Sequence, residues 1–185
     1  MTEILLVASL GLFLALLVAF LYVLRRAAGV VAATREEEAF RQGGAGVADR
    51  AAAAIVEGAA RIDRVRRRQD APTELDEVIP ALAERLAGLR DEAAVLDAPA
   101  SLALLRERLM AEIERAGRAV EAVEHGCLLL GMTAGRPREM EGETSVKRGY
   151  LNLLHAREAL VALAVDLRSG RVGASRWFTD RLRAG

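Results

Sequence analysis

The side chains that could do chemistry are few, and the two histidines come first. Glu121 and His125 lie four residues apart in one helical stretch, and His155 and Glu158 lie three apart in another. Helical bundles hold di-iron sites with two Glu-x-x-His motifs and further carboxylates, a pattern that this sequence lacks. We therefore predict histidines at the surface or at the boundary of a core, and no metal site.

The single cysteine is the next candidate. Cys127 lies in an apolar run from Gly126 to Leu130, where burial raises the pKa of a thiol and lowers its reactivity. No histidine stands beside it in a nucleophile motif. The sequence also has no phosphate-binding glycine loop, zinc-ligand spacing, nucleophile elbow or dinucleotide fingerprint. We predict no catalytic residue and no cofactor.

Two basic segments could bind anionic groups. The first is an arginine cluster comprising Arg61, Arg64, Arg66, Arg67 and Arg68. Anionic lipid headgroups attract such clusters by about 1 kcal/mol per cation near the surface. Two interpretations stay open for this cluster: a site for lipid or an acidic partner, and a solvated helix face.

The second basic segment is the expected tail, residues 171–185, which contains the only tryptophan. Trp177 and Phe178 follow Arg176, and Arg181 and Arg183 come after them. A short basic and aromatic segment is typical of membrane-interface binding. The alternative is docking of the two aromatic side chains on the apolar end of the helical body, near Leu128–Met132.

The element that would position these groups is an apolar N-terminal segment. Residues 4–24 carry no charge, and Arg25 and Arg26 follow directly. About 20 apolar residues cross a bilayer as a helix. A signal peptide would have a positive start and a shorter apolar core. We therefore predict one uncleaved transmembrane helix over 4–24, with residues 1–3 before it.

The distribution of charge around this segment predicts its orientation. No Lys or Arg precedes it, whereas Arg25 and Arg26 follow it, so the N-terminus is expected outside and the body in the cytoplasm of a single-pass protein in the cell membrane. One unpaired cysteine agrees with that compartment. The alternative is an extracytoplasmic body with a free thiol. Gly11, Ala15 and Ala19 share one helix face, a candidate face for pairing with another membrane helix.

The composition of the body favours helices and argues against nucleic acid. The body holds all 26 Lys+Arg and every Asp+Glu of the 26 except Glu3, which leaves a net charge of +1. Nucleic-acid-binding domains usually carry a large positive excess. Aromatic residues make up 4% and prolines number four, a profile typical of long helices.

The order of apolar and breaker residues predicts an all-α fold. A juxtamembrane helix with a glycine-rich joint covers 25–46, where Gly43, Gly44 and Gly46 are expected to interrupt the helix and form a hinge. A body over 47–170 follows, with apolar seams of 3- and 4-residue spacing in four stretches: 48–62, 75–96, 102–130 and about 144–167. A loop from Gly131 to about Gly142 is expected between the last two stretches.

The connections between the four stretches indicate how they pack. Thr73 is expected as the N-cap of the second stretch, Pro80 as the cause of a kink within it, and Pro99 near the start of the third. Short connections favour an antiparallel helical bundle of about four helices. The alternative is an extended coiled-coil rod that oligomerises through its seams.

One family shares this layout. Ile62-Asp63, Arg66-Arg67-Arg68, Asp70 and Ile79-Pro80-x-Leu82 form a stretch that resembles the Ile-Asp…Arg-Arg…Asp-Leu-Ile-Pro-Asn-Leu motif of LemA-type membrane proteins. The resemblance covers about 20 residues. Eight residues separate Asp70 from Ile79, where the family motif is nearly contiguous, and that family's Tyr-Asn-containing C-terminal helix has no counterpart. It implies a shared architecture only: one span and a cytoplasmic helical bundle.

These observations lead to three functional hypotheses. The first is a non-enzymatic membrane protein whose cytoplasmic bundle binds or scaffolds other proteins, self-associates, or contacts anionic lipid. The second is a signalling relay, in which the joint at Gly43–Gly46 passes a change in a partner span to the bundle. The third is a membrane-bound enzyme with a site that the sequence does not reveal.

Overall fold

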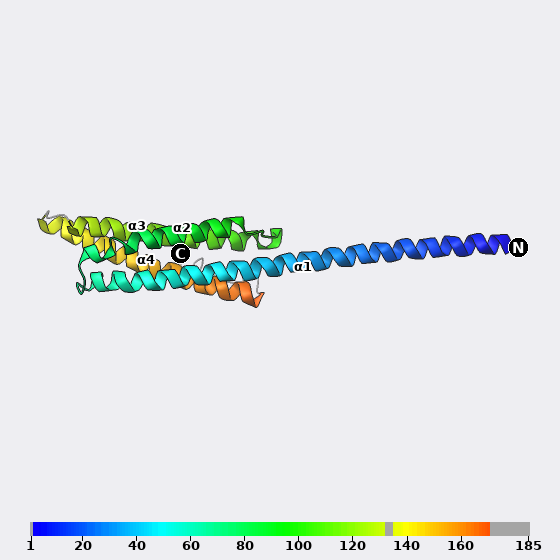
Figure 1. The fold of residues 1–185 in the computed structure, drawn as a ribbon, viewed down its shortest axis with the longest axis horizontal. Coiled ribbons are helices and arrows are strands. Elements are labelled where there is room, and N and C mark those ends of the chain that lie inside the picture. The colour runs from blue at the N-terminus through cyan, green and yellow to red at the C-terminus, as the bar shows by residue number, and fades with distance from the viewer. Residues whose placement is uncertain (1, 132–134, 171–185) are drawn as a thin grey trace, which may run out of the picture. The chain divides into compact units, whose positions relative to one another are not determined.

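A computed structural model describes residues 2–131 and 135–170, with side chains from Leu16 onward except at 27, 28, 30, 135 and 136. Within these ranges the chain is helical and has no strand. The prediction of an all-α chain with about four helices is confirmed. The helices are α1 (Thr2–Arg66), α2 (Val78–Val95), α3 (Ala103–Gly131) and α4 (Gly135–Ser169), with 3-10 turns η1 (Pro72–Leu75) and η2 (Ala100–Leu102) (Figure 1).

The chain divides into two compact units, Met1–Ala39 and Phe40–Gly185. In the first unit, α1 contains an apolar segment, and its described apolar side chains from Leu16 to Leu24 are exposed. Within the described ranges, α1 is the one helix that is long and apolar enough to cross a membrane. The second unit begins at Phe40, which is almost fully buried.

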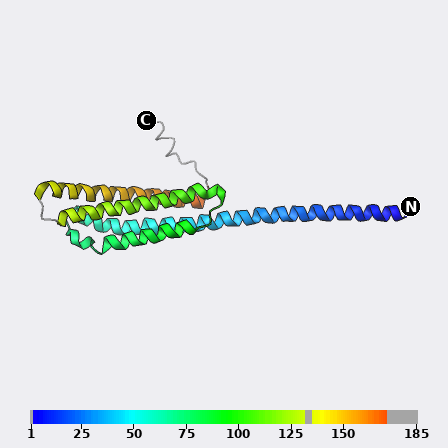
Figure 2. The same ribbon diagram turned by 90° about the horizontal axis from the view of Figure 1, so that it is seen from above.

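The helices of the second unit share one apolar core. Their predicted seams are mostly confirmed by burial, although Leu96, Cys127, Leu130, Tyr150 and Leu154 are only half-buried. The seam residues that are buried are Ala48, Ala52, Ile55, Ala59, Ile62, Leu75, Ile79, Leu82, Leu86, Leu89, Ala93, Leu102, Leu105, Leu109, Ile113, Ala116, Val120, Val123, Val146, Leu153, Leu160, Leu163 and Leu167. No charged or polar residue is buried among the described ones. Figures 1 and 2 show α2, α3, α4 and the second half of α1 side by side.

The contacts within this unit run in opposite numerical order along neighbouring helices. Between α1 and α2, the Arg50 guanidinium lies 2.5 Å from a Glu92 carboxylate oxygen, and Arg85 lies 3.3 Å from Glu57. Between α3 and α4, a Cβ added to Gly126 would meet Val146, and one added to Gly149 would meet Ala119. Moving along one helix therefore means moving back along its neighbour.

The expected interruption at Gly43–Gly46 is wrong, because α1 continues without a break to Arg66. A Cβ at Gly43 would lie 3.1 Å from Leu96 Cδ2, and one at Gly44 would lie 3.2 Å from Leu167 Cδ1. Gly44 is buried. Close packing of the helix at these two positions offsets the roughly 1 kcal/mol that each glycine costs in a helix.

The end of α1 is capped by a left-handed residue, Arg68, with φ +60°. Gln69 N–H donates to Arg64 C=O and Arg68 N–H donates to Val65 C=O, each at 2.9 Å. This pair of bonds is the Schellman motif, whose left-handed position glycine normally fills. An arginine there adopts a conformation that L-residues disfavour.

The expected start of the second helix is also wrong. Thr73 lies inside the 3-10 turn η1, and α2 begins only at Val78, after Glu77 as N-cap. Pro80 is therefore the third residue of α2. Its missing N–H falls among the first four, which have no partner within the helix, so Pro80 breaks no hydrogen bond and gives no reason for a kink.

The fourth helix begins about nine residues earlier than expected, at Gly135 rather than near Thr144. The glycines and Pro137 of this segment suggested a loop. Pro137 is the third residue of the helix, where its lack of an N–H costs little. Gly142 is buried against α3, since a Cβ there would lie 2.9 Å from Gly126 O.

Candidate functional site

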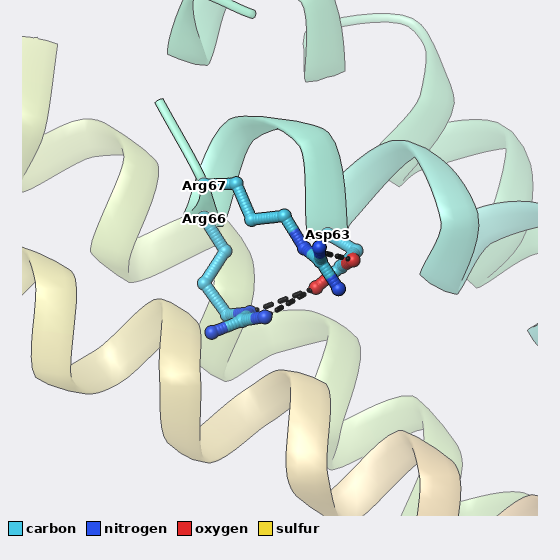
Figure 3. Close-up of polar contacts among 3 residues, drawn as sticks. All are labelled: Asp63, Arg66 and Arg67. Carbon is cyan, nitrogen blue, oxygen red and sulfur yellow. Dashed lines mark hydrogen bonds and ion pairs between the residues drawn. The ribbon is translucent and has the colours of Figure 1, made fainter. Parts of the chain in front are cut away.

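The arginine cluster lies where α1 ends, and Asp63 is its central acceptor (Figure 3). Arg66 donates to Asp63 Oδ1 from Nε at 2.9 Å and from its terminal nitrogen at 2.6 Å. Arg67 Nε lies 2.7 Å from the other carboxylate oxygen. Hydrogen bonding by Arg66, with the charges of both arginines, lowers the pKa of Asp63 below its ordinary value despite partial burial. The group is therefore ionised at neutral pH.

The remaining arginines pair with carboxylates from other parts of the chain. Arg64 Nε lies 2.8 Å from Asp70, and Arg68 pairs with Glu143 and, at 3.9 Å, with Glu139 of α4. The hydrogen bond and charge of Glu143 raise the pKa of Arg68. These pairs link the end of α1 to the turn after it and to the start of α4.

A cation–π contact adds to this link. The Arg66 guanidinium lies over the ring of Tyr150 of α4, 5.2 Å from its centroid. Of the five arginines in the cluster, Arg61 alone has no carboxylate partner within the described residues. Four carboxylates thus face five guanidiniums, which leaves little net positive charge to attract an anionic surface.

The cluster lies far from the first residue of the second unit. From Phe40 to Arg66, α1 advances about 39 Å at 1.5 Å per residue. The cluster therefore lies at the opposite end of the unit from the point where α1 enters it.

The other end of the unit is where α4 finishes. Arg168 pairs with Asp49 of α1, and Leu167 lies against Gly44. The end of α4 therefore lies beside the part of α1 that follows Phe40. Trp177, Phe178 and Arg181, the residues of the predicted interfacial or docking tail, lie outside the described residues.

The cysteine and the two histidines are the described groups with the most reactive side chains. Cys127 is half-buried, and burial, with a smaller contribution from Asp76, raises its pKa to about 11. His125 and His155 are exposed, as predicted. The described residues contain no group of three or more His, Cys, Asp or Glu that could hold a metal ion.

The residues proposed for the membrane segment are only partly described. Two members of the predicted pairing face, Gly11 and Ala15, belong to the part of α1 for which only the backbone is described, whereas Ala19 is exposed. Arg25 and Arg26, the residues that predict the orientation, are exposed on α1 directly after the apolar segment.

The sequence reasoning missed three glycines that join α3 to α4. A Cβ at Gly149 would lie 2.7 Å from Ala119 O, and one at Gly126 would lie 2.8 Å from Gly142 O and from Val146 N. The backbones of the two helices are thus in direct contact. The seven-residue spacing of Gly142 and Gly149 was the available signal, and it was missed because Gly142 was expected in a loop and Gly149 in the fourth helix.

The fold and these contacts define a class of protein: over residues 2–131 and 135–170, an all-helical chain with one helix long and apolar enough to cross a membrane. The chain matches no protein-family model, no curated protein and no solved structure. The resemblance to LemA-type proteins therefore remains one of layout.

Proposed function

We propose that the chain is a non-enzymatic, single-pass membrane protein that binds or scaffolds other proteins at the cytoplasmic membrane face. The observation that carries the proposal is the exposure of the apolar side chains from Leu16 to Leu24, between 42% and 65% for the large ones. Such a surface is unfavourable in water, by roughly 25 cal/mol for each Å². Lipid around residues 4–24 removes that cost.

The proposed body is an antiparallel bundle built from Phe40–Ser169. Its support is the opposite numerical order of the contacts between neighbouring helices and the short connections between them. The Asp49–Arg168 pair and the Arg66–Tyr150 contact show the same opposite order between α1 and α4, since residue numbers rise along α1 and fall along α4. A compact bundle, rather than an extended rod, follows from four seams that share one core.

The non-enzymatic part of the proposal rests on the chemistry of the candidate groups. A thiol whose pKa is about 11 is almost entirely protonated at neutral pH and is a poor nucleophile. His125 and His155 are exposed, and neither has a described carboxylate arranged with it as a general base. A protein partner, or a second copy through the face with Gly11, Ala15 and Ala19, fits these features better than a substrate.

Anchoring is tested by placing one charge in the apolar segment. We expect the intact chain to float with membranes and to resist extraction with carbonate. Val18→Arg should weaken this association, since an arginine at the centre of a span costs about 2.5–3.5 kcal/mol on insertion scales. Val56→Arg is the matched control, because Val56 is also exposed but lies in the second unit. Release of the unaltered chain without detergent contradicts the anchor.

Orientation and partner binding need separate measurements. A protease added to intact cells should leave the body undigested, and digestion from outside would contradict the cytoplasmic assignment. After gentle detergent extraction, a chemical cross-linker should capture a stoichiometric protein partner or a second copy. Repeated recovery of the uncrosslinked chain alone would contradict scaffolding.

A relay is the second candidate, and the continuity of α1 favours it. One uninterrupted helix leads from the apolar segment into the body, so a change in the span has a direct path. Gly29→Pro is the sharpest test, because nothing lies within 4 Å of a Cβ there and a proline in a helix interior breaks or kinks the helix. Gly29→Ala is the matched control, since it keeps the helix intact. Unchanged signalling output from Gly29→Pro contradicts a relay that acts through the unbroken helix.

A further inference from the structure

The outward face of α4 is apolar and exposed in the middle of the helix. Leu151 and Val161 are each 44% exposed and Val165 is 56% exposed, and Ala162 is exposed with them. Within the described residues, the ion pairs of α4 lie before residue 144 and at Arg168. Contiguous exposed apolar surface marks a site where a protein binds something else.

The outward face of α3 differs from that of α4. Glu107, Arg118 and Glu121 are exposed on α3, and charged side chains of this kind suit a helix face that stays in water. On α4, the exposed residues from 151 to 165 are four apolar ones and only two polar ones, His155 and Glu158. The outward face of α4 is therefore the one that needs an explanation.

Positions on this face recur at the spacing of a seam between two helices. The core face of α4 carries Leu153, Leu160 and Leu167, which are fully buried. A second stripe, with alternating spacings of three and four residues, follows the opposite side of the helix. The members of this outer stripe are Arg148, Leu151, His155, Glu158, Ala162 and Val165. The helix thus has two seams, and the described residues of the chain cover only the first.

A second copy of α4 that runs antiparallel matches the outer stripe. When His155 faces Glu158 of the second copy, Leu151 faces Ala162, because each of these lies four residues further from the centre. Two-fold symmetry repeats both contacts. His155 and Glu158 have no partner among the described residues, and an imidazole N–H can donate to a carboxylate. Polar thus meets polar, and apolar meets apolar.

The residues beside the outer stripe agree with this register. Leu154 of one copy comes opposite Val161 of the other, which adds apolar contact on one flank. One contact on that flank brings like charges together, Lys147 and Arg168. The Arg168 guanidinium already pairs with Asp49 of its own chain, so its charge is met there.

A parallel second copy would meet the same stripe with like charges. Each residue would then face itself, so that His155 meets His155, Glu158 meets Glu158 and Arg148 meets Arg148. Like charges placed opposite each other in an interface strongly disfavour a pairing. The charges of the outer stripe therefore select the antiparallel direction.

We infer that the outward face of α4 binds the same face of a second copy, antiparallel and with two-fold symmetry, through Leu151, His155, Glu158 and Ala162. The inference deepens the proposed function, because it rests on the proposed role in binding proteins and names a second copy as the partner. It does not involve residues 4–24. The outer stripe covers about 26 Å of one helix, which buries less area than the interfaces of tight complexes, so we expect the pairing to be reversible.

Disulfide trapping reads the register directly. Two variants of the full chain are prepared, Leu151→Cys and Ala162→Cys, each with Cys127→Ala so that the added thiol is the only one. Identical residues lie about 16 Å apart along the antiparallel pair, too far for a disulfide. Mild oxidation in detergent micelles should therefore give about tenfold more linked dimer in an equal mixture than in either variant alone. Ala111→Cys mixed with Ala162→Cys is the matched control, because Ala111 is exposed on α3.

Charge variants test the contact between His155 and Glu158. Glu158→Lys alone and His155→Glu alone each leave no opposite charges across the interface, and each should weaken dimer formation about tenfold in sedimentation. An equal mixture of the two should restore it, because each chain then supplies the charge that the other lacks. Such a restoration requires contact between chains. Glu121→Lys makes the same change at an exposed position of α3 and should have no effect.

Four results would overturn the inference. An equal disulfide yield from Leu151→Cys alone would show a parallel pair, and an equal yield with Ala111→Cys would show random collisions. Dimers that Glu158→Lys does not weaken would be joined through another face, such as the predicted pairing face of the apolar segment. A chain that stays monomeric would contradict the pairing outright. Flotation with membranes and capture of a different protein partner test the proposed function separately.

Discussion

The direct contact between the α3 and α4 backbones predicts that alanine is harmful at Gly149 and beneficial at Gly117. A Cβ at Gly149 would lie 2.7 Å from Ala119 O, 3.0 Å from Val123 N and 2.6 Å from Val123 Cγ2. Two of these atoms belong to the backbone and cannot turn away as a side chain does. Ordinary van der Waals contact begins at 3.4 Å, so the helices must separate locally by about 0.7 Å.

The magnitude follows from two opposing effects. Overpacking a tight core costs about 1–3 kcal/mol, and two backbone contacts place Gly149→Ala at the upper end of that range. Replacing a helical glycine by alanine returns about 1 kcal/mol. The free energy of unfolding should therefore fall by about 2 kcal/mol. At Gly117 nothing lies within 4 Å, so alanine there should raise it by about 0.5–1 kcal/mol.

The assay is urea unfolding of the full chain in detergent micelles, followed by the helical circular dichroism signal. For a chain of this size, the expected loss in Gly149→Ala corresponds to a fall in Tm of about 4–8 °C. The slope of free energy against urea should match that of the unaltered chain, which shows that the same surface unfolds. Equal stabilisation by both alanines would refute the close approach of α3 and α4.

Three further predictions concern the cysteine and the arginine cluster. Cys127 should react with an alkylating reagent about 100-fold more slowly than a free thiol at pH 8, because a pKa of about 11 leaves little thiolate. The reaction rate should keep rising with pH until the pH reaches about 11. Asp63→Asn should lower the free energy of unfolding by about 1 kcal/mol at neutral pH. Because the folded pKa of Asp63 is lowered, its contribution is complete above about pH 4 and is lost as pH falls through the folded value, so unfolding curves of the two proteins should converge in acid. Arg68→Gly should melt at a higher temperature than Arg68→Ala, since both lose the pair with Glu143 but only glycine relieves the left-handed backbone.

Periodicity allowed the helices and their buried faces to be predicted from sequence. Seam residues such as Leu86, Leu109 and Leu160 recur every three or four positions, and the structure buries most of the seam residues. This succeeds because helix packing requires one continuous apolar stripe, a condition that the residue order alone expresses. The count of about four helices follows from the same pattern.

Helix boundaries were less predictable, because breaker residues have position-dependent effects. Pro80 and Pro137 each fall at the third residue of a helix, where proline is tolerated. Gly44 and Gly142 lie inside helices because a neighbouring helix occupies the space that a Cβ would need. The residue types indicate breaks, whereas the tertiary contact that overrides them involves residues far along the chain.

The sequence reveals the arginine cluster, but it does not reveal which carboxylates pair with these arginines. Five arginines within eight residues suggest a basic surface, yet their charge is mostly met by Asp63, Asp70 and, from α4, Glu139 and Glu143. The first two acids are local and could have been weighed from the sequence. Glu139 and Glu143 reach the cluster only because of the register of α4 against α1, which no local sequence pattern reveals.

The register of α4 connects the glycine contacts to the ion pairs at both ends. Gly142 and Gly149 admit the α3 backbone at fixed positions, and that register brings Glu143 to Arg68 at one end and Arg168 to Asp49 at the other. A slip of one helical turn, about 5.4 Å, would bring bulky side chains against the α3 backbone and break both end pairs at once. Because exposed pairs add little stability singly, their main effect is to disfavour shifted registers, while the glycine contacts determine which register packs.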